Sequence, residues 1–395
     1  MKILLFGGAF DPPHNGHLAI LKEASQYIDF DKIIVMPTGI PTHKKGCTAP
    51  FDVRYHMAKL AFETVDSDVE VSDYEGNNLK DDYTYLTLRY LKEKYEDAEI
   101  YMLIGSDSLF SLRKWKNHSE VIANCTPVVF ARKDGQEAEI AREISEIEKL
   151  GAKIIYIPYK ITDVSSSAFR NNMVDYTALP EKVAEFIKEN NLYSEDDTLR
   201  WQGTAKLLAK LMLDEKRYIH TLNVEKLAAE MGEIFHLDVD KLRIAALLHD
   251  ILKNAPKDIL LHRASQSGII NRIEDKPKQT LHGFAAADYA EKEMGITDSE
   301  IIWSVRSHTC GRSGMTDMEK VIYLADMLCE GRKFPERNYL LSLAKKNLDV
   351  AMYKALVHSI EWIKSRGNVV DTDSLEALAY FEKLLGKDCK EEKYE

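Results

Sequence analysis

The stretch KILLFGGAFDPPHNGHLAILKEA, residues 2–24, decides the fold of the first half of the chain. Ile3 to Phe6 is an uninterrupted apolar run, which is typical of a buried strand. Gly7 and Gly8 follow and allow a tight turn with a close backbone approach to a ligand. A helix is predicted to open at Gly16 and His17. A loop that joins the end of a parallel strand to a helix N-terminus is where open α/β sheets bind anions, so we expect an anionic ligand here.

Five further apolar runs of similar length follow, and the alternating pattern continues to about residue 190. Amphipathic stretches with helical periodicity follow several of them. Such alternation predicts an α/β domain with a mostly parallel sheet and helices on both faces. The runs are KIIVMP (32–37), DVEVS (68–72), EIYMLIG (99–105), TPVVFAR (126–132) and AKIIYIP (152–158).

From about residue 200 the strand-like runs disappear and helical periodicity takes over. Helices are predicted over residues 199–235, 239–253, 283–295, 318–331 and 339–364. A change from α/β to all-α patterning marks a domain boundary, and we place it in the polar stretch ENNLYSEDDTLR, residues 189–200. The predicted domains are 1–194 and 198–386.

The composition excludes several classes of protein. The chain has 395 residues, 45% hydrophobic and 30% charged, which is incompatible with a disordered or fibrous protein. Its net charge of -11 disfavours a nucleic-acid binder, although local cations or a metal still permit acidic small substrates. The five cysteines form no C-x-x-C pair and indicate a reducing compartment. No signal peptide or spanning segment is evident, so we expect a cytoplasmic protein that does not engage membranes.

The string GGAFDPPHNGH resembles the H-x-G-H signature of the nucleotidyltransferase superfamily, and in particular that of bacterial nicotinate-nucleotide adenylyltransferases. The resemblance implies a Rossmann-like fold and transfer of AMP from ATP, with Mg²⁺, to nicotinate mononucleotide. It makes His14 and His17 catalytic, because imidazoles can donate hydrogen bonds to phosphate oxygens as charge develops. A lone histidine in such a loop would more often only cap it.

Five other segments carry the same resemblance: PTGIPTHKK, RYHMAKLA, DDYTYLTLRYL, LIGSDSLFSLRKWKN and DVSSSAFR. In the last one Ser167 and Phe169 replace the family's Thr and aliphatic residue, and Arg170 is retained as a catalytic phosphate ligand. The resemblance implies that RYHMAKLA is the helix after the first of these segments and that the remaining segments contact substrate. The binding residues it implies are Gly8, Phe10, Thr42, Lys44, Tyr83, Thr84, Gly105, Asp107, Trp115, Arg132 and Ser166.

Histidines and aspartates recur in order through the helical half: His220, His249, Asp250, His282, His308 and Asp326. The pair His249 and Asp250 lies within the apolar stretch AALLHDILK. Burying such a pair costs several kcal/mol unless a metal or another partner compensates. Imidazole and carboxylate ligands suit divalent transition metals, and two ions bridged by an aspartate would suit hydrolysis of a phosphoanhydride.

This order of residues resembles the HD-domain phosphohydrolases, and more closely the symmetrical bis(5′-nucleosyl)-tetraphosphatases. The resemblance implies that His220, His249, Asp250 and Asp326 bind Fe²⁺ or another divalent metal, and that Asp250 is catalytic. It gives His282 and His308 to the nucleotide phosphates or to a second ion. The substrate would be diadenosine tetraphosphate, cleaved to two ADP. Further expected phosphate or nucleotide contacts are Arg217, Lys253, Thr309 and Arg332.

Several alternatives remain open at this point. The first half could use nicotinamide mononucleotide or phosphopantetheine in place of nicotinate mononucleotide. The second half could be a different HD nucleotide hydrolase, or a nucleotide sensor without turnover, or it could clear dinucleotide by-products of adenylyl transfer. The sequence fixes neither the metal nor the oligomeric state, a homo-oligomer included.

Overall fold

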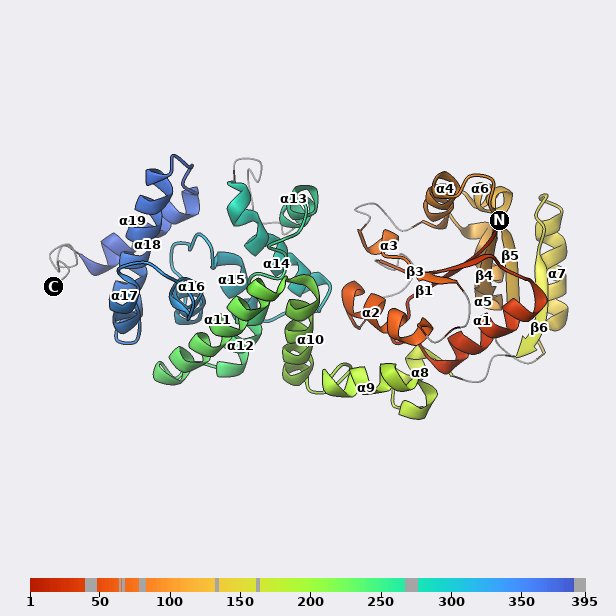
Figure 1. Ribbon diagram of the computed structural model, residues 1–395, viewed down its shortest axis with the longest axis horizontal. Helices are drawn as coiled ribbons and strands as arrows, with labels where there is room; N and C mark the ends of the chain where they lie inside the picture. The colour runs from red at the N-terminus through yellow and green to blue at the C-terminus, as the bar shows by residue number, and fades with distance from the viewer. Residues whose placement is uncertain are drawn as a thin grey trace. The chain divides into compact units, whose positions relative to one another are not determined.

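The computed structural model describes residues 1–39, 48–63, 65, 68–77, 83–131, 135–160, 164–266 and 276–386. The chain divides into two compact units, Met1–Glu189 and Asn190–Glu395. Among the described residues, the strands all belong to the first unit and the second is helical (Figure 1). The predicted succession of an α/β fold and an all-α fold is confirmed.

One parallel six-stranded sheet organises the described part of the first unit, in the order β3-β2-β1-β4-β5-β6. The strands are β1 Lys2–Gly8, β2 Lys32–Pro37, β3 Val69–Val71, β4 Glu99–Gly105, β5 Thr126–Ala131 and β6 Ile155–Lys160. Each overlaps one of the apolar runs that the sequence marks as a strand, although β6 ends two residues beyond its run. Runs without polar alternation are expected for strands that are covered on both faces.

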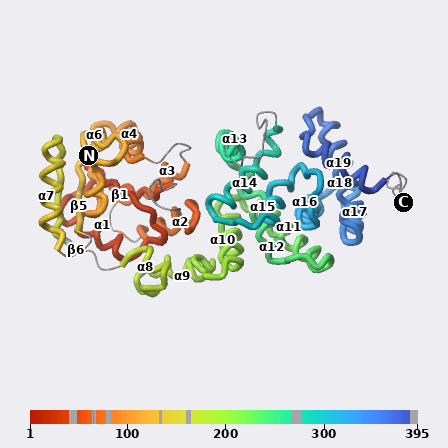
Figure 2. Tube along the Cα trace, turned by 180° about the vertical axis from the view of Figure 1, so that it is seen from behind, coloured from red at the N-terminus to blue at the C-terminus, as the bar shows by residue number. Residues whose placement is uncertain are grey.

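Helices cover both faces of this sheet (Figures 1 and 2). Ile3 and Leu5 point into a core formed with α4 to α7, whereas Phe6, the next residue along β1, packs against Phe62 of α2, with ring centroids 5.9 Å apart. The helices are α1 Asn15–Tyr27, α2 Phe51–Phe62, α3 Tyr74–Asn77, α4 Thr84–Lys94, α5 Ser106–Ser111, α6 His118–Asn124, α7 Glu137–Glu148, α8 Ser166–Arg170 and α9 Glu181–Glu189.

The strand order reverses at β1, which has β2 on one side and β4 on the other. Ligands of open α/β sheets bind at such a switch point, beyond the carboxyl ends of the strands. In this unit the segments after β1 and β4 flank that point, and they carry His14, His17, Gly105 and Asp107. The topology therefore gathers two separate predicted motifs at one edge of the sheet.

The second unit is built from helices whose first turns are mostly capped by Asp, Asn or Thr side chains. They are α10 Asp197–Met212, α11 Glu215–Ile234, α12 Val239–Leu248, α13 Lys257–Gln266, α14 Leu281–Lys292, α15 Ser299–Ser307, α16 Asp317–Leu328, α17 Arg337–Ala344, α18 Leu348–Ser365 and α19 Thr372–Leu385. None of the helices in the described ranges combines the length and the apolar character needed to cross a membrane.

Three of the predicted helices are shorter than the sequence pattern suggests. The run 199–235 breaks before Asp214, whose side chain caps α11, and the run 339–364 breaks before Asn347, which caps α18. The helix predicted over residues 239–253 ends at Leu248. His249 is therefore its C-cap and Asp250 lies beyond it, in a turn closed by the hydrogen bond from Lys253 N to Asp250 O. That turn brings Asp250 and Lys253 toward the same side.

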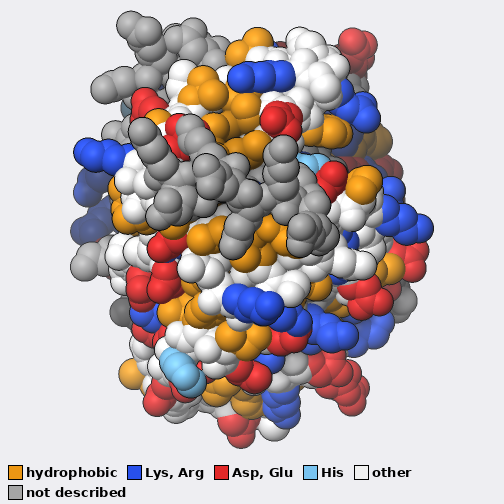
Figure 3. All heavy atoms as spheres, turned by 90° about the vertical axis from the view of Figure 1, so that its left-hand side faces the viewer, with side chains coloured by type: hydrophobic (Ala, Val, Ile, Leu, Met, Phe, Trp, Pro, Cys, Tyr) orange, Lys and Arg blue, Asp and Glu red, His pale blue; other side chains and the backbone are white. Residues whose placement is uncertain are grey.

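The surface of the second unit around α17 to α19 mixes apolar side chains with charges of both signs (Figure 3). Trp362, Val369 and Leu384 are among the exposed apolar residues there. Large apolar side chains scattered in this way are common on soluble surfaces and carry no functional implication.

Candidate active sites

His14 and His17 stand at the start of α1 with their rings stacked, the centroids 3.7 Å apart. The backbone N–H of His14 donates to Nδ1 of His17 at 3.0 Å. Because Nδ1 accepts, the proton of the neutral His17 ring lies on Nε2. His17 is thus held in the tautomer that can donate a hydrogen bond from Nε2 to a phosphate oxygen.

The short helix α8 brings Ser166 and Arg170 against the loop between β1 and α1, although about 150 residues separate them. Ser166 Oγ donates to Pro12 O at 2.8 Å, and Nη1 of Arg170 donates to Asp11 O. Arg170 also forms an ion pair with the Asp11 carboxylate at 3.4 Å. The predicted catalytic arginine is therefore anchored beside the two histidines.

Gly105 and Asp107 occupy the turn from β4 into α5, and Gly8 ends β1 beside it in the sheet. Phe10 differs from the expectation for a ligand-facing side chain, because it is 1% exposed and packs edge-on against Phe6 and Phe62. Any contact of Phe10 with substrate would therefore be made by its backbone.

Tyr83 and Thr84 begin α4, and the ammonium of Lys116 lies 4.1 Å from the centre of the Tyr83 ring. Trp115 is not fully exposed to solvent, although a lysine precedes it and another follows it in the sequence. Its ring is partly buried against the sheet core and its Nε1 donates to Ser111 Oγ at 3.2 Å. Thr42, Lys44 and Arg132 lie outside the described residues.

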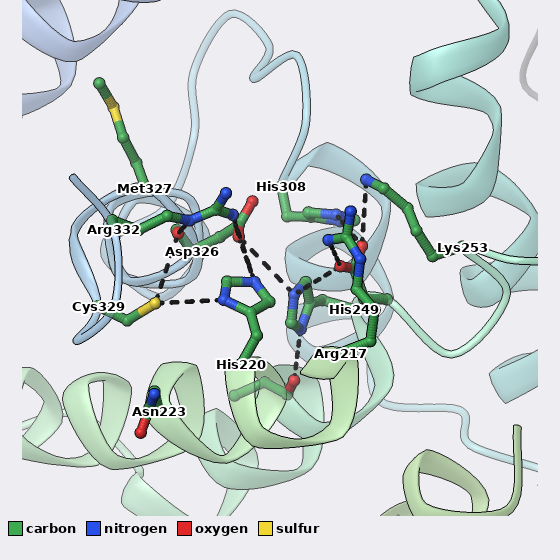
Figure 4. A network of polar contacts seen from close by, with 12 residues as sticks. Arg217, His220, Asn223, His249, Lys253, His308, Asp326, Met327, Cys329 and Arg332 are labelled. Atoms are coloured by element: carbon green, nitrogen blue, oxygen red, sulfur yellow. Dashed lines mark hydrogen bonds and ion pairs between the residues drawn. The ribbon is translucent and has the colours of Figure 1, made fainter. Parts of the chain in front are cut away.

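The second unit gathers its predicted ligands from five helices and the turns that follow two of them. His220 comes from α11, His249 and Asp250 from the end of α12, His282 from α14, His308 from the end of α15 and Asp326 from α16. Figure 4 shows most of this network. Nitrogen and carboxylate oxygen atoms of these residues form three groups in which each atom lies within 4.8 Å of the others.

The first two of these groups centre on His249, which is fully buried. Its Nδ1–H donates to Ala246 O at 2.6 Å, so the lone pair lies on Nε2. Nε2 has no hydrogen-bond partner in the described residues, yet it faces Asp250 at 3.7 Å and Asp326 at 3.9 Å. A buried lone pair that faces two carboxylates without a proton between them fits a divalent cation. His220 completes the set, with Nε2 2.9 Å from Asp326 Oδ1.

The third group joins Asp250 to His282 and His308, so that Asp250 is shared between neighbouring groups. His282 Nε2 lies 3.0 Å from Asp250 Oδ1. A Cβ atom at Gly283 would lie only 3.0 Å from Arg306 O and 3.2 Å from the His308 ring, which explains the glycine next to His282. A carboxylate common to both groups is the arrangement expected for two bridged ions.

The protonation equilibria favour cation binding. Burial lowers the pKa of His249 to about 4, and burial likewise lowers that of His282 to about 4. Burial by itself would raise the pKa of Asp250, but His249, His282 and other neighbours hold it well below its usual range. At neutral pH the site therefore presents two neutral imidazoles and an ionised carboxylate, which is the form that binds metal.

Cationic side chains surround these ligands. Arg217 Nη1 lies 3.0 Å from Asp250 Oδ2, Lys253 Nζ lies 2.9 Å from His282 Nε2, and Arg332 contacts Asp326. Three of the four predicted phosphate or nucleotide contacts thus lie beside the ligand groups, and each of these three side chains remains more than a quarter exposed. Thr309 follows His308 directly and its hydroxyl lies 3.6 Å from Cys310 Sγ.

Comparison with known proteins agrees with the families that the sequence motifs of both halves suggest. A cytidylyltransferase-like family model matches residues 5–172 and an HD domain model matches residues 217–331. A Mycoplasma genitalium protein named "Probable nicotinate-nucleotide adenylyltransferase/Ap4A hydrolase" is 31% identical over 89% of this chain and 95% of its own. The chain belongs to this two-domain enzyme family.

Each half of the chain also matches shorter proteins that cover that half alone. A Clostridium novyi protein named "Probable nicotinate-nucleotide adenylyltransferase" is 37% identical over 48% of this chain and 97% of its own length. A Clostridium acetobutylicum protein whose crystal structure is described as that of a "predicted HD superfamily hydrolase involved in NAD metabolism" is 30% identical. The match covers 46% of this chain and 96% of that one, with a TM-score of 0.44. Membership of the family implies a divalent-metal site in the HD domain, in agreement with the ligand groups described above.

Two residues that the sequence interpretation did not select organise the first site in this enzyme. Arg54 is 1% exposed and donates to the carbonyls of Ala9, Gly39 and Ala49 at 2.8 to 3.0 Å. Asp11 accepts the N–H groups of Thr48 and Ala49. A charged arginine at an inward position of an otherwise apolar helix face was the available signal.

A fourth group of possible ligands, Cys310, Asp371 and Asp373, has a different explanation. Lys276 Nζ lies 2.7 Å from Asp371 and 2.6 Å from Asp373, so an ammonium already pairs with both carboxylates. Burial raises the pKa of Cys310 to about 12, which keeps its thiol protonated. We interpret this group as a structural cross-link between the segment before α14 and the start of α19.

Proposed function

We propose that the first unit transfers AMP from ATP to nicotinate mononucleotide, giving deamido-NAD and pyrophosphate. A phosphate oxygen of the mononucleotide attacks the α-phosphorus of ATP, and the bond from that phosphorus to the β-phosphate oxygen breaks. The main support is the stacked pair of His14 and His17 beside Arg170, which supplies donors to the phosphates without a protein nucleophile. Mg²⁺ accompanies ATP as part of the substrate.

The acceptor end of this site is proposed to lie between α4 and the segment after α5. Tyr83, Thr84 and Trp115 would bind the pyridine ring, with Gly105 and Asp107 on the adenosine. Lys116 carries a positive charge at this end, which favours the carboxylate of nicotinate over the neutral amide.

The second unit is proposed to hydrolyse diadenosine tetraphosphate between its second and third phosphates, which yields two ADP. The observation that supports this best is the carboxylate of Asp250, shared between groups of ligand atoms and flanked by cations. Fe²⁺ or another divalent transition metal, as one ion or two, would be held by His220, His249, Asp250 and Asp326 with His282 and His308. Such ions lower the pKa of water and offset phosphate charge.

The residues of this chain would contribute binding and orientation. Arg217, Lys253 and Arg332 would hold the tetraphosphate by charge-assisted hydrogen bonds, and the buried histidines remain neutral ligands at physiological pH. An acidic chain can bind this tetra-anionic bridge because local cations outweigh the global charge within a Debye length. We propose a cytoplasmic location, because the substrates proposed for the two units, ATP with nicotinate mononucleotide and diadenosine tetraphosphate, are nucleotides of that compartment.

One set of variants tests both assignments in the full chain. His17→Ala is expected to lose adenylyl transfer and to keep hydrolysis of diadenosine tetraphosphate. Asp250→Ala is expected to lose this hydrolysis and to keep adenylyl transfer. Products are separated after anaerobic reconstitution with Fe(II) or Mn(II). Asp240→Ala, an exposed carboxylate on α12, is the matched control and should keep both reactions. Unchanged hydrolysis in Asp250→Ala would refute the hydrolase, and ATP plus AMP as products would refute symmetrical cleavage.

A further inference from the structure

The second ring nitrogen of His220 has an unusual neighbour. His220 Nδ1 lies 3.4 Å from Sγ of Cys329, which is fully buried at the end of α16. The same sulfur lies 3.7 Å from Asp326 O. Figure 4 shows the imidazole of His220 with the thiol on one side and the Asp326 carboxylate on the other.

Two of the other histidines of the site show what a metal ligand ordinarily requires. Nδ1 of His249 donates to Ala246 O at 2.6 Å, and Nδ1 of His308 donates to Val305 O at 2.7 Å. A carbonyl can only accept, so each contact fixes the proton on Nδ1 and leaves Nε2 with its lone pair. At His220 a sulfur takes the place of the carbonyl.

A thiol differs from a carbonyl because it can both donate and accept a hydrogen bond. When Nε2 of His220 carries the proton, it donates to Asp326 Oδ1 across the observed 2.9 Å, and Nδ1 can accept the S–H of Cys329. When Nε2 offers its lone pair to an ion, the proton lies on Nδ1 and the sulfur accepts it. Cys329 satisfies Nδ1 in both tautomers.

We propose that Cys329 is a positioning residue that orients His220 as a metal ligand while allowing its tautomer to change. The proposal rests on the metal site of the proposed function, but not on which nucleotide that site hydrolyses. It makes His220 the ligand that can leave the metal for Asp326 without leaving Nδ1 unpaired.

The proposal is tested by measuring the binding of Mn(II) alone to the full chain. The electron paramagnetic resonance signal of free Mn(II) reports how much ion remains unbound. Cys329→Val removes the hydrogen bond and keeps the position apolar, and is expected to weaken Mn(II) binding by roughly 10- to 100-fold. Cys329→Ser keeps a group that donates and accepts, and should stay within a few-fold of the parent. Cys125→Val is the matched control, since Cys125 is also a buried cysteine at a helix end, in the other unit.

A double-variant cycle separates positioning from packing. In a His220→Ala background, Cys329→Val should have no further effect on Mn(II) affinity, because the ring it orients is gone. Equal losses with and without His220, or parental affinity in Cys329→Val, would overturn the proposal. If the valine variant fails to fold, Cys329→Ala against Cys329→Ser supplies the same comparison. Absence of Mn(II) binding in the parent chain would instead reject the metal site itself.

Discussion

The Nε2 atoms of His282 and His308 lie 3.1 Å apart, and both face the Asp250 carboxylate, at 3.0 and 3.7 Å. Nδ1 of His308 already donates to a backbone carbonyl, so its Nε2 offers a lone pair in the neutral ring. Two imidazole nitrogens that converge on one carboxylate have the chemistry of a second cation site next to the one around His249 and Asp326.

We therefore expect the reconstituted chain to bind two divalent ions, and His282→Ala to bind one. His282 belongs only to the group with Asp250 and His308, so its loss should leave the other ion in place. The metal content per chain, measured by mass spectrometry after removal of free ion, checks this. His262→Ala, an exposed histidine on α13, should retain both ions. A single ion in the parent chain would contradict the prediction.

Arg217 provides a test of phosphate binding that is separate from metal binding. Its Nη1 contacts Asp250 while about a third of the side chain stays exposed, so it can reach a ligand over the site. Arg217→Ala should raise KM for the tetraphosphate by roughly tenfold or more, since a charge-assisted hydrogen bond contributes about 1.5–3 kcal/mol. The ion content should not change. Lys216→Ala, its exposed neighbour, should leave KM unaltered, and equal effects of both would argue against a specific contact.

Arg54 is expected to be the most sensitive position of the first unit outside the histidines. Replacement by Met leaves three carbonyls without their donor, at a cost of about 1–3 kcal/mol each where they stay buried. Arg54→Met should therefore lower the free energy of unfolding of this unit by roughly 3 kcal/mol or more and abolish adenylyl transfer. Hydrolysis by the other unit should persist.

The matched control for Arg54 is Arg89→Met. Arg89 is paired with Glu120 while its side chain is 55% exposed, and exposed ion pairs contribute at most about 1 kcal/mol. Denaturant titration of both variants makes the comparison. If Arg54→Met were as mild as Arg89→Met, the buried contacts would not hold the loops of the site.

The strands of the first unit were predictable because burial on both faces leaves continuous apolar runs, such as Ile33 to Met36. Helix ends were harder to predict. The periodicity of residues 199–235 continues through Asp214, since α10 and α11 both bury apolar faces, and only the cap marks the break. The predicted roles of the site residues stay predictions. The structure adds their proximity, which the sequence order could not supply.

The contacts that the sequence could not reveal are those made between distant elements. Arg54 reaches carbonyls on three segments, and Cys329 lies more than a hundred residues from His220. The inward position of Arg54 on an apolar helix face signals burial but not its partners, and Cys329 carries no local signal of its contact with His220. His249 and Asp250 could be identified as buried polar residues, but their place beyond the end of α12 depends on a turn that an apolar run conceals.

The metal-free second unit should become less stable as the pH falls from about 6.5 toward 4. The pKa values of His249 and His282 are about 4 in the folded chain against 6.5 as the ordinary value. The unfolded chain therefore binds more protons in this window, and folding stability drops with falling pH. Between pH 7 and pH 5 the loss amounts to roughly 2 kcal/mol for each histidine. The depressed pKa of Asp250 extends the loss below pH 4.

Urea unfolding of the chelated protein at both pH values measures this loss through tryptophan fluorescence. Trp201, Trp303 and Trp362 report on the second unit, and Trp115→Phe removes the tryptophan of the first. His282→Asn should show about half of the acid destabilisation, because one of the two titrating rings is gone. An equal loss in the parent and in His282→Asn would show that this histidine is not held neutral by burial.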